Sequence, residues 1–483
     1  MNWNEHHRDA ILNENIQITK NEVLFSEKIV LISLSNILIM KLLQILFFFQ
    51  AFLFSGCVHS HEKVFYRLND SIQCEQQPEQ FYCVYLPDTV STGKKYPVLF
   101  LFDPSARAKK AVEQYSTLAD KYNIILACSY NSKNGPVEDN TLAAHAMISD
   151  ALEKFPVDEN LILYSGFSGG SRFAYYYAQN FRKAKGLIAT GAFYPVGNKP
   201  FSVPDWIYSG VVGNADFNFT EGLNMANTLW RSGYPFQFIT TDEEHGWPSD
   251  TAFERALCYQ LSQITGNKFL ESEYIELEEE ALEKSKSVSE FINSLWILQN
   301  LSFIDRNYTT EMQNLSNEKS FTLQLKEFEK SIRLEDSLKI EFGNAVRGIL
   351  MQTNNQTDGF KSLKWWEGTI NKLNEISTSD NSIYLQHAAN RARAHIGILL
   401  WEINRKLVKE KFYNKSLEAA EILILAYPEN DTYYAIKAES LYVLGNKTEA
   451  MKNIARALEL GYTKDNEYLK NNQILKKISE ELE

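Results

Sequence analysis

Cysteine and positive charge are both scarce in this chain. Its 483 residues include five cysteines, which is too few for a fold held together by disulfides. No Cys-x-x-Cys pair occurs, so we expect no structural zinc site. The formal net charge is −12, whereas a general nucleic-acid-binding surface needs clustered lysine and arginine. Composition and charge therefore exclude a disulfide scaffold and argue against nucleic acid as a partner.

The remaining composition is that of an ordinary globular protein, with 44% apolar and 23% charged residues. It excludes a mainly disordered, a collagen-like or a multi-span membrane chain. At about 150 residues per domain, the length predicts two or three domains.

One strongly apolar stretch spans residues 29–56 and contains a single charge, Lys41. From Met40 onward it reads as a short positive start, a compact apolar run and then small residues, which is the layout of a secretory signal. Its end, residues 54–57, resembles a bacterial lipoprotein cleavage box, in which the cysteine becomes the lipidated first residue. We expect residues 1–62 to form a signal or lipoprotein segment, with Cys57 lipidated and translation starting at Met40.

The alternative for the same stretch is an uncleaved membrane anchor, because about 20 apolar residues can span a bilayer. Either interpretation places the rest of the chain in the bacterial cell envelope, facing the periplasm or the exterior. The membrane is then a partner through the N-terminal anchor.

Two cysteines, Cys74 and Cys83, flank the polar stretch 75–80. In an oxidising compartment they would close a hairpin as a disulfide. Two unpaired cysteines on strands are the alternative, and the sequence leaves both open.

Residues 63–270 alternate short β-rich runs with helical patterns. The expected strands are 81–86, 98–102, 124–128, 161–165, 186–190, 206–212 and 236–240. The expected helices are 111–121, 141–155, 171–180, 220–232 and 251–265. This alternation predicts an α/β domain with a doubly wound, mostly parallel sheet covered by helices on both faces.

Residues 271–483 have almost no strand signal. Glycine and proline are sparse there, and Glu, Lys, Leu and Ala dominate, so we expect an all-α domain. Residues 411–461 carry a rhythm of small and large residues that resembles tetratricopeptide helix pairs. Such domains usually bind peptides or proteins, so a protein or peptide partner is expected for this part.

The most informative motif is an apolar strand followed by Gly166-Phe-Ser168-Gly-Gly170 and then a helix. A nucleophile elbow needs this order, because small neighbours let the helix approach the strand while the serine projects from a tight turn. The helix N-terminus also favours developing negative charge. We predict Ser168 as a nucleophile.

A catalytic serine needs a histidine base, and residues 63–270 contain two histidines. His145 precedes the serine and stands inside a helical pattern, so we interpret it as a helix residue. His245 follows the last expected strand, where the base belongs when the chain order is serine, acid, histidine. We predict His245 as the base.

The acid is expected after the preceding strand. Asp216 follows the strand 206–212 in a turn, and Glu221 is the fallback. For the oxyanion hole, the N–H of Gly169 is one expected donor. The second should come from residues 103–105. Pro104 has no N–H, so Ser105 is favoured over Asp103.

These residues together resemble the α/β-hydrolase superfamily. More narrowly, they are similar to bacterial envelope esterases of the polyhydroxybutyrate-depolymerase-like and dienelactone-hydrolase-like group. The resemblance covers about residues 64–268, and its matching segments are 102–104, 131–135, 166–170, 213–218 and 245–248. It implies Ser168 as nucleophile, Asp216 as acid and His245 as base.

The sequence thus predicts a carboxylic-ester hydrolase of the cell envelope that acts on a small-molecule or glycan-linked ester. No metal or organic cofactor is implied. Two alternatives stay open. One is a serine peptidase on the same fold, disfavoured because no propeller or long cap is inserted between the strands. The other is a non-catalytic scaffold whose helical domain binds a protein partner.

Overall fold

The computed structural model describes residues 67–91, 93–182, 184–194, 204–288, 290–350, 361–379, 382–463 and 472–482. The expected signal segment, its start at Met40 and the lipidation site Cys57 lie outside these residues. Within the described part of the chain, no helix is both long and apolar enough to cross a membrane.

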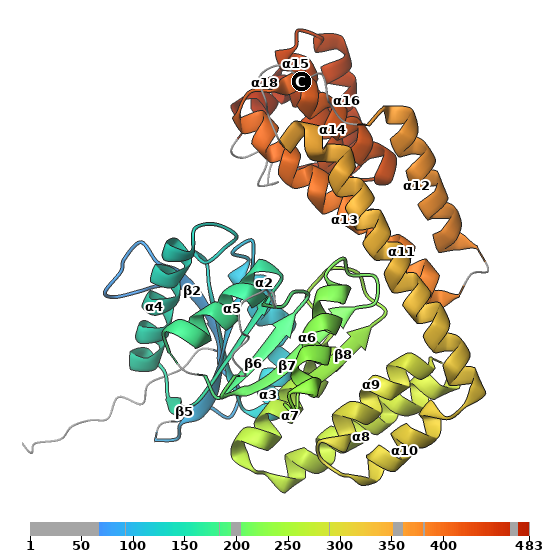
Figure 1. Cartoon of the computed structure of the whole chain (residues 1–483). Coiled ribbons are helices and arrows are strands. Elements are labelled where there is room, and N and C mark those ends of the chain that lie inside the picture. The colour runs from blue at the N-terminus through green and yellow to red at the C-terminus, as the bar shows by residue number, and fades with distance from the viewer. Residues whose placement is uncertain are drawn as a thin grey trace, which may run out of the picture. The chain divides into compact units, whose positions relative to one another are not determined.

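An eight-stranded sheet forms the centre of the N-terminal part (Figure 1). Its strands are β1 (Leu68–Gln73), β2 (Phe81–Tyr85), β3 (Tyr96–Phe102), β4 (Ile125–Ser129), β5 (Val157–Phe167), β6 (Gly186–Thr190), β7 (Ile207–Gly213) and β8 (Gln237–Thr241). They lie in the order β1-β2-β4-β3-β5-β6-β7-β8. β2 pairs antiparallel with β1 and β4, and every pair from β4 to β8 is parallel. The predicted mostly parallel sheet is confirmed.

Helices cover both faces of the sheet, because alternate side chains of each strand point to opposite sides. On β3, Phe100 and Phe102 belong to one buried cluster and Leu99 and Leu101 to another. The first cluster is completed by α4 (Val137–Lys154), α5 (Gly169–Asn180) and α6 (Phe219–Arg231). The second is completed by α2 (Ala108–Gln114), α3 (Ser116–Tyr122) and α7 (Asp250–Thr265). Strands buried on both faces explain the continuous apolar runs in the sequence.

Two local expectations were wrong. The single helix expected at 111–121 is divided into α2 and α3 at Tyr115. The Tyr115 ring is buried, stacks on Phe253 at 4.0 Å and donates its hydroxyl to the carbonyl of Pro248, which fixes it between the two helices. Strand β1 was not expected, because its sequence is mostly polar and its register to β2 shifts between Asn69 and Ile72.

Cys74 and Cys83 are not bonded to each other. Both are buried, but they belong to the clusters on opposite faces of the sheet. Of the two interpretations left open by the sequence, the unpaired cysteines are therefore the ones found. Burial raises the pKa of the Cys74 thiol to about 11.

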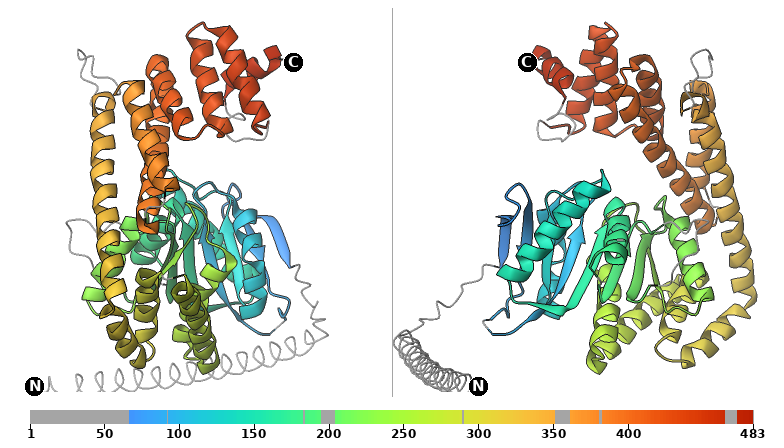
Figure 2. Two further views of the ribbon diagram at one scale, coloured as in Figure 1. Left: turned by 90° about the vertical axis from the view of Figure 1, so that its right-hand side faces the viewer. Right: turned by 60° about the vertical axis from the view of Figure 1, so that its left-hand side comes forward.

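After the sheet the described chain is helical, as predicted. The helices are α8 (Lys268–Ser287), α9 (Phe291–Ser302), α10 (Asn307–Ser316), α11 (Lys319–Leu350), α12 (Leu363–Thr378), α13 (Ile383–Lys409), α14 (Tyr413–Ala426), α15 (Asp431–Val443), α16 (Lys447–Glu459) and α18 (Gln473–Leu482). The long helices α11 and α13 run side by side in both views of Figure 2. The tetratricopeptide resemblance of residues 411–461 stays a prediction.

The buried core of the sheet continues into the first of these helices. Trp296 of α9 packs edge-on against Phe238 of β8, with ring centroids 5.2 Å apart. Leu282 of α8 and Leu301 of α9 belong to the same buried cluster as the sheet residues. The division expected between residues 270 and 271 stays a prediction, and apolar packing is continuous across it.

Candidate active site

Ser168 lies in a strained turn between β5 and α5. Its φ of 52° and ψ of −120° are unusual for a residue with a side chain, and such strain is characteristic of functional sites. The two flanking glycines are required by close approaches. A Cβ on Gly166 would lie 2.4 Å from the backbone of Gly170, and one on Gly170 would lie 2.0 Å from the carbonyl oxygen of Phe102. The motif thus forms the strand–turn–helix that the sequence predicted.

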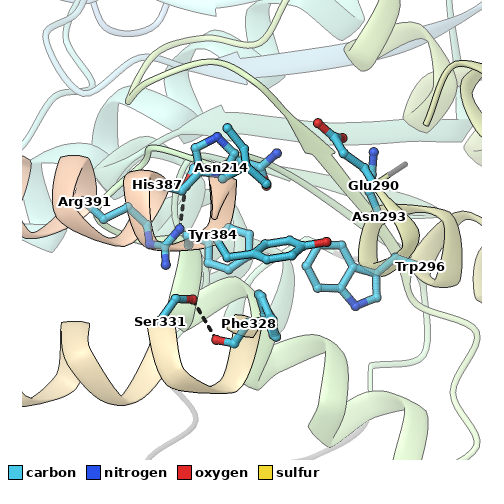
Figure 3. Close-up of a pocket in the computed structure, with 11 residues that line it drawn as sticks. Asn214, Glu290, Asn293, Trp296, Phe328, Ser331, Tyr384, His387 and Arg391 are labelled. Atoms are coloured by element: carbon cyan, nitrogen blue, oxygen red, sulfur yellow. Dashed lines mark hydrogen bonds between the residues drawn. The ribbon is translucent and has the colours of Figure 1, made fainter. Parts of the chain in front are cut away.

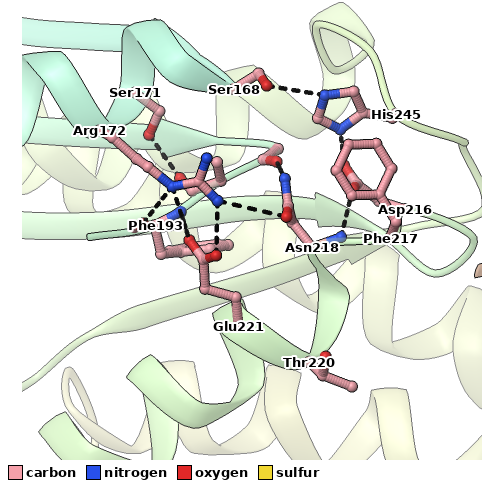
Figure 4. Close-up of polar contacts among 12 residues, drawn as sticks. Ser168, Ser171, Arg172, Phe193, Asp216, Phe217, Asn218, Thr220, Glu221 and His245 are labelled. Carbon is pink, nitrogen blue, oxygen red and sulfur yellow. Dashed lines mark hydrogen bonds and ion pairs between the residues drawn. The ribbon is translucent and has the colours of Figure 1, made fainter. Parts of the chain in front are cut away.

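His245 links Ser168 to Asp216 in one line of hydrogen bonds (Figure 4). Its Nδ1 lies 2.8 Å from Asp216 Oδ2, and its Nε2 lies 3.0 Å from Ser168 Oγ. A carboxylate only accepts hydrogen bonds, so Nδ1 carries the proton and Nε2 accepts from the serine hydroxyl. The three residues singled out by the sequence are therefore brought together.

The sheet explains why they meet. Ser168, Asp216 and His245 follow β5, β7 and β8, and parallel strands place their carboxyl ends at one edge. Asp216 is 1% exposed, and its second oxygen Oδ1 accepts the backbone N–H of Asn218 at 2.8 Å. Both carboxylate oxygens are thus engaged, which fixes the orientation of this side chain.

Aromatic rings hold the imidazole. Phe217 and Phe167 lie with ring centroids 4.3 Å and 4.6 Å from that of His245. Phe167 also contacts Trp247, whose indole N–H donates to Asp103 Oδ2 at 2.8 Å. Burial would raise the pKa of Asp103, but the hydrogen bonds from Arg107 and Trp247 hold it below its ordinary value.

The loop after β3 is closed on itself. Asp103 Oδ1 accepts the backbone N–H of Ser105 at 2.8 Å and that of Arg107 at 3.2 Å. The Ser105 N–H is therefore engaged within its own loop. Ser105 as the second oxyanion donor stays a prediction that this contact does not support.

Asn134 lies directly over Gly169, a contact that the sequence reasoning missed. A Cβ on Gly169 would be 1.8 Å from the side-chain oxygen of Asn134. Asn134 lies in the segment 131–135, which carried part of the family resemblance, so the sequence did offer a reason to consider it as a site residue. The two residues border an open pocket of about 220 Å³ whose lining also includes Lys133, Arg172 and Tyr176.

Glu221, the fallback acid, does not reach the histidine. Its carboxylate pairs with Arg172 of α5 at 2.7 Å and accepts the backbone N–H of Phe193 at 2.7 Å (Figure 4). Arg172 also donates to Asn218 Oδ1 at 3.4 Å. This network ties the helix that begins at Ser168 to the loop that carries Asp216.

His145 is a helix residue, as interpreted. It lies on α4, and its Nδ1 is 2.6 Å from the hydroxyl of Tyr177. Burial lowers its pKa.

The fold is that of the α/β hydrolases. Its strand order, with the strained serine turn after β5, defines that assignment. No family model matches the sequence, and no curated protein matches it.

Several solved structures are similar to part of the chain. A ferulic acid esterase is 17% identical with a TM-score of 0.32, covering 42% of this chain and 98% of that one. An a/b serine hydrolase without lid from Xanthomonas campestris is 16% identical with a TM-score of 0.30, covering 38% and 88%. A putative dienelactone hydrolase from Klebsiella pneumoniae is 14% identical with a TM-score of 0.31, covering 39% and 90%.

Proposed function

We propose that this chain is a serine hydrolase that cleaves a carboxylic ester through an acyl-enzyme. The observation that carries the proposal is the hydrogen-bonded line from Ser168 through His245 to the buried Asp216. A serine in a strained turn, a base within 3.0 Å of its hydroxyl and an acid behind the base are the parts that nucleophilic acyl transfer needs.

In the proposed reaction, Nε2 of His245 takes the proton from Ser168 as Oγ attacks the ester carbonyl carbon. Asp216 holds the imidazole in the required tautomer and stabilises its charged form. The tetrahedral intermediate collapses, and His245 gives the proton to the departing alcohol. A water, deprotonated by the same histidine, then releases the acid and restores Ser168.

The oxyanion forms at the N-terminus of α5. The Gly169 N–H faces it, and the helix dipole adds a favourable field. The side chain of Asn134 lies against Gly169: a Cβ placed on Gly169 would be 1.8 Å from Asn134 Oδ1 and 3.4 Å from Nδ2, the atom that carries its two N–H donors. We assign the second donor to Asn134, in place of Ser105.

An ester is favoured over a peptide because the connections between successive strands from β3 to β8 are short, and the longest of them, between β4 and β5, holds the single helix α4 and not a propeller or long cap. The sequence of residues 1–62 supports attachment to the cell envelope through Cys57. A small-molecule or glycan-linked ester that reaches the envelope is the proposed substrate. A protein or peptide partner of residues 411–461 is proposed as well, on the tetratricopeptide resemblance alone.

Fluorophosphonate labelling tests the function directly, because this reagent modifies activated serines. We expect the full chain to be labelled and Ser168→Ala and His245→Ala to stay unlabelled. Ser171→Ala is the matched control. Ser171 lies three residues after Ser168, on α5, and its hydroxyl donates to the carbonyl of Ala192. Labelling should persist in that variant.

Parallel assays with p-nitrophenyl acetate and aminoacyl p-nitroanilides separate an esterase from a peptidase. Faster turnover of the amides would replace the ester proposal with the peptidase. A folded wild-type protein that is neither labelled nor active on either substrate would contradict the hydrolase and favour the non-catalytic scaffold.

A further inference from the structure

The loop that carries Asp216 is held from the helical region as well as from the sheet. Arg391 of α13 donates from Nη1 to the carbonyl of Asn214 at 2.7 Å. Lys339 of α11 donates from Nζ to the carbonyl of Phe217 at 3.2 Å and to Thr220 Oγ1 at 3.0 Å. The two carbonyls stand on either side of Asp216, so the backbone is fixed before and after the acid.

One carboxylate joins the two cations. Glu335 of α11 lies 2.6 Å from Arg391 Nε through Oε2 and 2.6 Å from Lys339 Nζ through Oε1. Glu335 is fully buried and Arg391 is 2% exposed. The guanidinium also lies over the ring of Phe219, with 4.6 Å to its centroid. The three residues thus form one connected group against the acid loop, with Glu335 and Arg391 buried and Lys339 partly exposed.

Figure 3 shows this contact from the side of the helices, with Arg391 reaching from α13 toward Asn214 and with His387 and Tyr384 beside it. Burying charges costs free energy, and a buried ion pair is often no more stable than apolar residues of the same size. Stability alone therefore does not account for placing a Glu–Arg pair at this loop.

We propose that Glu335, Arg391 and Lys339 are positioning residues for Asp216. They hold the backbone at Asn214 and Phe217 so that the carboxylate of Asp216 faces Nδ1 of His245. The inference rests on the proposed function, since it gives the helices α11 and α13 a part in the same reaction. It makes the helical region a working part of the hydrolase site.

Lys339→Met is the informative variant. Lys339 is 20% exposed, and Glu335 keeps its pair with Arg391 when Lys339 is removed, so the change leaves no unpaired buried charge. A displacement of about 1 Å in a catalytic group can lower the rate about 100-fold. We expect kcat for p-nitrophenyl acetate to fall about 10- to 100-fold with KM changed less than about threefold. Arg391→Gln should act in the same direction.

A further readout separates positioning from folding. Lys339→Arg, which keeps a cation at the site, should recover most of the lost kcat. Glu278→Gln is the matched control: it breaks another buried Arg–Glu pair, the one between α7 and α8, and should lower the melting temperature with kcat unchanged.

The outcomes are distinguishable when measured on the full chain. An active wild type with unchanged kcat in folded Lys339→Met and Arg391→Gln would overturn the inference and leave the hydrolase standing. A wild type with no turnover, or turnover that survives in Ser168→Ala, would remove the proposed function and this inference with it.

Discussion

The side-chain amide of Asn300 pairs with both backbone groups of Phe238. Its Oδ1 accepts the Phe238 N–H at 3.0 Å, and its Nδ2 donates to the Phe238 carbonyl at 3.1 Å. Phe238 lies on β8, the last strand of the sheet, so these groups would otherwise be an unpaired edge. One asparagine of α9 thereby takes the place of a ninth strand at this position.

Asn300→Leu is expected to destabilise the fold. It leaves a buried N–H and a buried carbonyl without partners, each worth about 1–3 kcal/mol, so the free energy of unfolding should fall by about 2–6 kcal/mol. Urea denaturation measures this. Gln299→Leu, on the same helix but bonded only to Ser302 Oγ at 3.3 Å, is the control and should change stability little. Equal losses of unfolding free energy in the two variants would show that the pairing of Asn300 with the Phe238 backbone does not stabilise the fold.

The two candidate acids should separate by kinetics. Asp216→Asn is expected to lower kcat by about 10⁴, because an amide cannot hold the required tautomer of His245. Glu221→Gln should keep kcat within about tenfold, since its contacts are to Arg172 and the Phe193 backbone. Steady-state hydrolysis of p-nitrophenyl acetate gives both values. A larger loss in Glu221→Gln would reverse the assignment of the acid.

Gly170→Ala should abolish activity and destabilise the protein. The added Cβ would lie 2.0 Å from the carbonyl oxygen of Phe102, and that backbone cannot give way without separating α5 from β3. Gly246→Ala is the matched control in the loop of His245, because open space surrounds the position of its Cβ. The melting temperature and kcat should both be much lower in Gly170→Ala than in Gly246→Ala. A Gly170→Ala variant with unchanged stability and kcat would contradict the close approach of Gly170 to the Phe102 backbone.

Two histidines of α13 should make the stability pH-dependent. Burial, reinforced by Arg391, lowers the pKa of His387 to about 4, with Asp242 acting in the opposite direction. Burial and Lys339 lower that of His395 to about 4, with Glu335 opposing. Unfolded histidine titrates near 6.5, so the unfolded chain binds more protons between these values. Stability is fully present above pH 6.5 and falls as the pH drops toward 4.

Each histidine should account for at most about 3 kcal/mol of that loss. Replacing His387 or His395 by Gln should flatten the profile of unfolding free energy between pH 6.5 and 4, measured by urea denaturation at each pH. An unchanged slope in both variants would contradict the lowered pKa values.

Asn134→Ala tests the second oxyanion donor. Loss of one donor is expected to lower kcat about 100- to 1000-fold, with less change in KM, because the donor acts on charge that develops in the transition state. Lys133→Ala lines the same pocket and is the control. If both variants retain kcat, the donor is not Asn134, and the loop after β3, residues 103–105, becomes the next candidate.

Most of the sheet and the line from Ser168 to Asp216 could be predicted because their signals are local. Each predicted strand is an apolar run between turn residues, and each of the three site residues directly follows such a run. The close approaches at Gly166 and Gly170 are likewise encoded in adjacent residues. Chain order and strand order then suffice to bring the three side chains together.

The rest depends on contacts that local patterns do not reveal. Asp103 closes its own loop through a side-chain hydrogen bond, so the N–H of Ser105 is engaged although its sequence position looked suitable. Lys339 and Arg391 are 122 and 177 residues away from their partners Phe217 and Asn214. No motif surrounds either cation, because their roles arise only from how α11 and α13 pack against the sheet.

Because of that separation along the chain, the acid loop and the cations that hold it are synthesised at different times. At an elongation rate of about 5–20 residues per second, the codons for Arg391 are read on the order of ten seconds after those for Asn214. During this interval the nascent sheet can form, but the loop of Asp216 still lacks its two cations. The acid loop is therefore completed by a segment that is synthesised later, and the newly made protein acquires its finished geometry only after α13 has been synthesised.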